Sequence, residues 1–214
     1  MIDLHTHTLL SDGVLLPAEL AQRYKVKGCE ILGITDHVDQ SNIDFVVPRL
    51  VQTCKDYSKK VGITLLPGCE ITHVIPSLFP DLVKHARKLG AKVIIGHGET
   101  LVEPVEKGTN RAAIESGVTI LAHPGLITDE DVKLAAEKGV CLEITARGGH
   151  SLSNGHVCQL ARKYGAQAIF STDAHTPANL RTRESADDIL AGAGFMRDEI
   201  DKIWKDMYAL CEKL

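Results

Sequence analysis

The sequence has no apolar run of about 18 residues, the length that spans a bilayer as a helix. Residues 1–7 also lack the basic segment and the apolar stretch of a secretory signal peptide. These two absences predict a protein without a membrane span, and we expect it to be cytoplasmic.

An excess of positive charge is missing as well. Lys and Arg number 24 against 28 for Asp and Glu, so the net charge is -4 at pH 7. The chain as a whole therefore gives no strong signal for a nucleic-acid partner, and affinity for phosphate has to come from a local pocket.

Two families of short motif are also absent. The six cysteines form no CxxC pair and are widely spaced, which argues against a disulfide framework and against a closed structural zinc site. We expect reduced thiols, with Cys69 in the core. The sequence contains no GxSxG elbow and no Walker loop, so nothing in it predicts a phosphoenzyme.

The 214 residues, 44% of them apolar, instead show a regular alternation typical of one parallel α/β domain spanning residues 1–214. Seven short apolar runs are predicted as strands: Ile2–Leu4, Ile31–Ile34, Thr64–Leu66, Lys92–Ile95, Thr119–Ala122, Cys141–Ile144 and Ala168–Phe170. Each is followed by a predicted helix: Pro17–Lys27, Ile43–Val61, Pro76–Leu89, Asn110–Ser116, Asp129–Lys138, Asn154–Tyr164 and Asn179–Ala193.

Glycine after six of these helices supports the count, because glycine easily adopts a left-handed helix cap. These glycines are Gly28, Gly62, Gly90, Gly117, Gly139 and Gly165. A last amphipathic stretch, residues 198–214, is expected to form a helix that packs on the outside of the domain.

Histidine, aspartate and glutamate gather directly after the predicted strands. His5 and His7 are two residues apart in extended chain, so their side chains point the same way and can share one ion. In a parallel barrel, the carboxyl ends of all strands meet at one rim. The other residues predicted at this rim are Asp12, Asp36, His37, Glu70, His97, His123, Asp173 and His175.

Imidazoles and carboxylates are costly to bury without partners, and divalent metal ions would neutralise them. This mixture of ligands suits zinc, manganese or iron. Asp36 adjoins His37 but faces the other side of the strand, so we expect it to orient a ligand. His85 and His156, each inside or beside a predicted helix, are interpreted as surface histidines.

Six motifs occur in one order over nearly the whole chain: His5-x-His7 with Ser11-Asp12-Gly13, Thr35-Asp36-His37, Gly68-Cys69-Glu70, Gly96-His97, Ala122-His123-Pro124 and Ser171-Thr172-Asp173-Ala174-His175. Each motif is weak alone, but the ordered set is specific. It resembles the polymerase and histidinol phosphatase superfamily, known as PHP domains. The resemblance implies a distorted seven-stranded (β/α) TIM-like barrel, in agreement with the seven units.

The resemblance further implies three divalent metal ions. The first would be held by His5, His7, Glu70 and Asp173. The second would be held by Glu70, His97 and His123, and the third by Asp12, His37 and His175. Glu70 would then bridge two metals. Some family members have histidine where this chain has Asp12, a change that keeps a ligand but alters its charge.

Phosphoester hydrolysis is the reaction that such a site predicts. A hydroxide bridging two metals would attack a small phosphorylated metabolite or nucleotide. In the loop after the sixth strand, Arg147 is the leading candidate to bind phosphate and His150 to donate a proton to the leaving group. His73 and Glu99 also follow strand ends, although His73 fits a surface position equally well.

Two alternatives stay open. A metal-dependent amidohydrolase or lactonase also begins with an HxH strand, but the sequence offers no strand-end lysine for carbamylation and fills a third ligand triad that such enzymes do not need. A non-catalytic barrel in a nucleic-acid-processing assembly predicts eroded ligands, whereas all nine positions are filled. The native metal, the substrate, the preference for monoester or diester and the oligomeric state are left open by the sequence.

Overall fold

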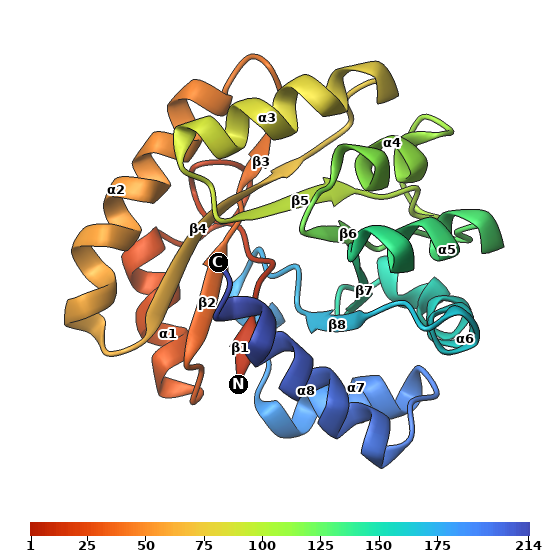
Figure 1. Cartoon of the computed structure of the whole chain (residues 1–214). Coiled ribbons are helices and arrows are strands. Elements are labelled where there is room, and N and C mark those ends of the chain that lie inside the picture. The colour runs from red at the N-terminus through yellow and green to blue at the C-terminus, as the bar shows by residue number, and fades with distance from the viewer.

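The computed structural model describes residues 1–214, apart from the side chain of Lys59. Within this described chain, seven parallel strands form a nearly closed, distorted TIM-like barrel (Figure 1). The strands pair in the order β1 (Ile2–Asp3), β2 (Ile31–Ile34), β4 (Thr64–Ile71), β5 (Val93–His97), β6 (Ile120–Ala122), β7 (Cys141–Thr145) and β8 (Ala168–Ser171). A short segment, β3 (His37–Val38), follows β2 and pairs with the end of β4. The predicted fold class is confirmed.

The first and last strands meet and nearly close the barrel. Beyond the end of β1, Thr6 pairs with Ala174 in a parallel bridge. The backbone N–H of His7 donates to the carbonyl oxygen of Ala174 at 2.9 Å. This closure places the chain around His5 and His7 beside the chain around Asp173, which is far away in sequence.

The helices lie outside the barrel (Figure 1). They are α1 (Pro17–Val26), α2 (Ile43–Val61), α3 (Phe79–Leu89), α4 (Thr109–Ser116), α5 (Asp129–Lys138), α6 (Asn154–Tyr164), α7 (Arg183–Gly192) and α8 (Arg197–Cys211). Short 3-10 turns occupy Pro76–Leu78, His150–Ser153 and Pro177–Asn179. All six glycines predicted after helices have a positive φ angle, as a left-handed cap requires. No helix in the described chain is long and apolar enough to cross a membrane.

The core consists of the strands and the inner faces of the helices. Ile94, Leu121, Leu142 and Ile169 on neighbouring strands are at most 1% exposed, as expected of a parallel sheet covered on both faces. Helix α8 contacts β1 and β8. Its Trp204 lies 6.0 Å from the ring of Phe170 and donates a hydrogen bond to Asp187 of α7.

Strand β4 is longer than the sequence predicts. The predicted end at Leu66 was wrong because the strand continues through Pro67 and Gly68 to Ile71, in register with β5. Only glycine fits at Gly68, since a Cβ atom there would lie 2.3 Å from the carbonyl oxygen of Val93. Glu70 therefore lies within a strand and not in the loop after it.

The helix predicted from Asn179 begins at Arg183. The preceding residues form the 3-10 turn, in which the side-chain oxygen of Asn179 accepts hydrogen bonds from the backbone N–H groups of His175 and Thr176. This turn fastens His175 at the rim of the barrel.

Candidate metal centre

The first group of possible ligands lies where β1 and β8 meet. The ligand atoms of His5, His7 and Asp173 all lie within 4.8 Å of one another, and all three residues are buried. His5 Nε2 is 3.2 Å from Glu70 Oε2, and His7 Nε2 is 3.2 Å from Asp173 Oδ1. The two histidines point the same way, as their spacing predicts.

The second group consists of Glu70, His97 and His123, which come from β4, from β5 and from the turn after β6. Their ligand atoms also lie within 4.8 Å of one another. Glu70 Oε1 is 3.5 Å from His123 Nε2, whereas Oε2 faces His5. The two oxygens of Glu70 thus face two different groups, which is the arrangement of a bridging carboxylate.

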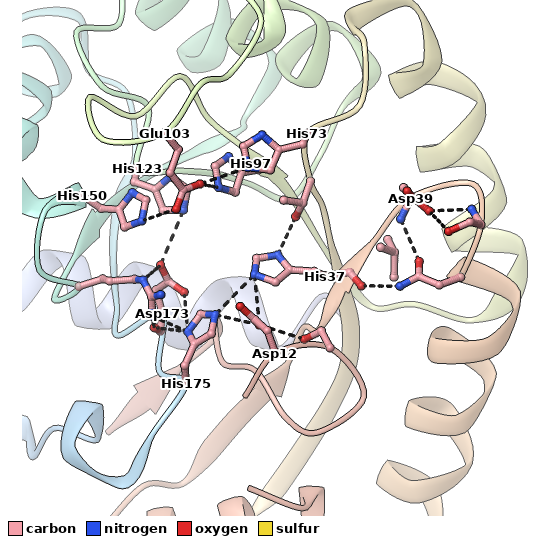
Figure 2. A pocket seen from close by; sticks show the side chains of 16 residues that line it. Asp12, His37, Asp39, His73, His97, Glu103, His123, His150, Asp173 and His175 are labelled. Atoms are coloured by element: carbon pink, nitrogen blue, oxygen red, sulfur yellow. Dashed lines mark hydrogen bonds and ion pairs between the residues drawn. The ribbon is translucent and has the colours of Figure 1, made fainter. Parts of the chain in front are cut away.

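The third group, at the mouth of the pocket, contains Asp12, His37 and His175, with His7 beneath them (Figure 2). Asp12 Oδ1 is 3.1 Å from His175 Nε2 and 3.4 Å from His37 Nε2. The other ring nitrogen of His37 lies 2.8 Å from Glu70 Oε2, which joins this group to the first. The side chain of Asp12 is 57% exposed.

Buried polar atoms at this centre test whether metal ions fit. Among the described side chains, eight such atoms form no hydrogen bond: His5 Nε2, His7 Nδ1 and Nε2, Glu70 Oε1 and Oε2, His97 Nδ1, His123 Nδ1 and Asp173 Oδ1. Each buried unpaired polar atom costs about 1–3 kcal/mol. A divalent cation between these nitrogens and oxygens removes that cost, so the residues fit metal ions.

Backbone strain occurs at the same place. His123 and Asp173 have φ angles of 28° and 49°, a region that residues other than glycine rarely adopt. Such strain costs about 1–3 kcal/mol per residue and is concentrated at functional sites.

The electrostatics of the site follow from its burial. Burial alone would lower the pKa of His5, but the carboxylates of Glu70, Glu143 and Asp173 raise it well above its usual value. Burial and the neighbouring imidazoles of His37 and His5 lower the pKa of His7 well below its usual value. Burial would raise the pKa of Glu70, yet His5, His37 and His97 lower it well below the usual range. A carboxylate that stays ionised in the core attracts cations.

Arg147 and His150 line the same pocket, a cavity of about 460 Å³. Arg147 Nη1 donates to His175 Nδ1 at 2.6 Å, and Nε lies 3.4 Å from Asp173 Oδ2. Nδ1 of His150 is 2.7 Å from the hydroxyl of Thr100. Burial and the nearby His123 lower the pKa of His150 to about 4, so this ring is neutral at pH 7.

Asp36 lies below the third group and contacts the chain, not a ligand ring. Its carboxylate accepts hydrogen bonds of 2.6–2.7 Å from the backbone N–H and hydroxyl of Thr8 and from the hydroxyl of Ser11. These contacts fasten the turn between His7 and Asp12, so Asp36 can orient both ligands through the backbone.

Two carboxylates at this centre were missed by sequence reasoning. Glu103, on the loop after β5, lies 3.0–3.4 Å from the Nε2 atoms of His97, His73 and His150. A hydrogen bond from His97 lowers the pKa of Glu103 to about 2. Nothing in the sequence distinguishes Glu103 from other loop acids.

The second missed carboxylate is Glu143 in the middle of β7, where it hydrogen-bonds His5 Nδ1 at 2.7 Å. Burial would raise its pKa, but His5 and His123 lower it to about 2. A single charge inside the apolar run Cys141–Ile144 was the available signal.

The remaining candidates lie away from the pocket, except His73, which lines it. Glu99 caps α4 by accepting hydrogen bonds from the backbone N–H groups of Gly108 and Asn110. At the surface, His85 pairs with Asp44, and His156 bonds the carbonyl oxygen of Ile127.

The chain belongs to the PHP family, whose domain model matches residues 3–112, about half of the sequence. The ordered motifs, the barrel and the grouped ligands agree with that assignment.

Two curated relatives match over most of the chain. An uncharacterized protein from Methanocaldococcus jannaschii is 41% identical over 202 residues, which cover 93% of this chain and 92% of the relative. A probable phosphatase from Aeromonas hydrophila is 26% identical over 228 residues, covering 93% and 88%.

Among solved structures, a chain from archaeal ribonuclease P with mature tRNA has a TM-score of 0.76. It is 20% identical and covers 99% of this chain and 90% of its own length. At this identity the likeness is one of fold.

Proposed function

We propose that the protein is a metal-dependent phosphoesterase that hydrolyses a small phosphorylated metabolite or nucleotide. The observation that supports this most strongly is Glu70, buried between two groups of histidines with one oxygen facing each. Phosphoryl transfer commonly uses two metal ions held this way. Membership of the PHP family and the similarity to a probable phosphatase agree with the proposal.

The three groups assign the ligands. His5, His7, Glu70 and Asp173 would hold the first ion, Glu70, His97 and His123 the second, and Asp12, His37 and His175 the third. The mixture of imidazole and carboxylate suits zinc, manganese or iron. When bound, such ions would lower the pKa of a coordinated water and neutralise charge on the phosphoryl oxygens.

The protein's own groups bind and orient the substrate. Two nitrogens of Arg147 are tied to Asp173 and His175, while no protein partner of Nη2 is found among the described side chains. We assign Arg147 to a phosphoryl oxygen, since guanidinium groups bind phosphate with directed N–H donors. His150, held by Thr100, is assigned to the leaving-group oxygen, toward which a neutral ring can donate a hydrogen bond.

Metal analysis and a substrate screen test the proposal. After supplementation with manganese or zinc, we expect at least about two equivalents of metal per chain. Fewer would remove the physical basis of the proposal. The screen compares phosphomonoesters, phosphodiesters and nucleotides, with released phosphate or released alcohol as the readout.

Two further arms of the screen address other functions. A lactone and an amide test amidohydrolase activity, although none of the described side chains that line the pocket belongs to a lysine. An RNA oligonucleotide and a tRNA test an RNA-associated role, which the ribonuclease P fold likeness raises. Binding of RNA without hydrolysis of any phosphoester would favour the scaffold over the enzyme.

A further inference from the structure

Glu143 is a fully buried carboxylate in the middle of β7, with Leu142 and Ile144 as its neighbours in sequence. It accepts three hydrogen bonds: from His5 Nδ1 at 2.7 Å, from the backbone N–H of His123 at 2.9 Å, and from the hydroxyl of Ser171 at 2.5 Å. A buried carboxylate is tolerated only when hydrogen bonds of this kind compensate its desolvation.

The two oxygens of Glu143 act on two different ligand groups. Oε1 faces the ring of His5, whose Nε2 points to Glu70 Oε2 in the first group. Oε2 accepts from the backbone of His123, whose Nε2 faces Glu70 Oε1 in the second group. No contact of Glu143 with Asp12, His37 or His175 occurs in the described part of the chain.

Each contact has a consequence for metal binding. A hydrogen bond from His5 Nδ1 to a carboxylate keeps the proton on Nδ1, so that the lone pair of Nε2 is free for a cation. The bond to His123 holds a residue whose φ angle is 28°, a conformation that persists only when its surroundings enforce it.

We propose that Glu143 is a positioning residue that assembles the first and second metal sites together. It fixes the tautomer and the orientation of His5 and holds the backbone of His123, while the third site forms without it. The inference rests on the metal assignment in the proposed function.

The substitution Glu143→Gln tests this role without changing the volume of the side chain. An amide has one oxygen, so if the oxygen accepts from His5, the NH2 group meets the backbone N–H of His123, and the reverse orientation fails at His5. We expect about 10–100-fold weaker binding at two sites, the range found for groups that support metal ligands. Competition with a chelator measures the affinity, and the exchange-coupled Mn²⁺ pair signal in electron paramagnetic resonance should disappear.

Two variants serve as matched controls. Ser171→Ala removes a hydrogen bond to the same oxygen of Glu143 but keeps both contacts to ligand residues, so the coupled pair should remain. Asp12→Ala should lose one equivalent of metal and also keep the coupled pair. Unchanged metal affinity in folded Glu143→Gln, or loss of the pair in Asp12→Ala alone, would overturn the proposal.

A measurement on the unmodified, metal-loaded protein keeps the proposal testable if Glu143→Gln does not fold. Nitrogen NMR of the histidine rings should show His5 protonated at Nδ1, and protonation at Nε2 would contradict the proposal. These readouts are independent of turnover. Tight metal binding without phosphoesterase activity would refute the proposed function alone, whereas equal binding by Glu143→Gln would refute only the role of Glu143.

Discussion

The floor and the mouth of the metal centre differ in how rigidly the protein holds them. At the floor, the side chains of His5, His7 and Glu70 are fully buried. At the mouth, the side chains of Asp12 and His37 are 57% and 25% exposed. Mouth residues lie on loops beyond β1 and β8 and on the short β3, whereas Glu70 lies inside β4.

The supporting contacts differ in the same way. The floor is supported from beneath by Glu143, which bonds a ring and a backbone group. At the mouth, the ring of His37 bonds a threonine hydroxyl, and that of His175 bonds Arg147, itself partly exposed. A rigid, dry floor is suited to permanent metal ions, and an exposed mouth is suited to an exchangeable ion and to substrate.

The largest effect is expected from Glu70→Ala, which removes the carboxylate between the two floor groups. We expect loss of both floor metals and a decrease of about 10³-fold or more in turnover of an aryl phosphate, because electrostatic groups at a reacting centre commonly contribute this much. Metal analysis and steady-state kinetics measure the two effects. Glu99→Ala is the matched control, since Glu99 also follows a strand but caps α4. Retained turnover in Glu70→Ala would refute the bridging role.

A smaller effect is expected when the mouth is changed. Asp12→Ala should lose one metal equivalent and about 10–100-fold of activity, while the floor metals stay bound. Asp12→His restores a ligand without its charge and should recover the third equivalent in part. A time course of chelation should show one equivalent leaving the unmodified protein first. Loss of all the metal from Asp12→Ala would show that floor and mouth are one cooperative unit.

The barrel and the rim could be predicted from the sequence because both depend on local patterns. Each apolar strand is followed by a helix, and parallel strands place their carboxyl ends together. His5, Glu70 and Asp173 are far apart in sequence, yet this rule alone brings them to one rim. The glycine after each helix was equally predictable, since a left-handed cap is a property of single residues.

Features that depend on packing between strands could not be predicted in this way. The length of β4 depends on its register with β5, and the register is not visible in Pro67 and Gly68. Glu143 contacts His5 across the barrel from a strand interior, where the rule about strand ends does not look. Glu103 reaches the pocket only because its loop folds back over His97.

The effect of Arg147→Lys on the mouth should be smaller again. Lysine keeps the charge but loses the directed N–H donors that hold His175 and Asp173. We expect about a 10-fold decrease in kcat/KM, mainly through KM, with an unchanged metal content at the floor. Steady-state kinetics with matched metal analysis separate these effects. An unchanged KM would show that Arg147 supports the structure of the mouth and does not bind phosphate.

The smallest effect on activity is expected beneath the floor, at Tyr24→Phe. The hydroxyl of Tyr24 donates to buried Asp3 at 2.6 Å, and Asp3 also accepts from Thr172, next to Asp173. Loss of this buried hydrogen bond should lower the free energy of unfolding by about 1–2 kcal/mol, measured by urea denaturation. Metal content and turnover should stay within about twofold, because Thr172 still holds Asp3. A loss of floor metal in this variant would contradict that expectation and would extend the rigid floor from Glu143 down to the Asp3 network.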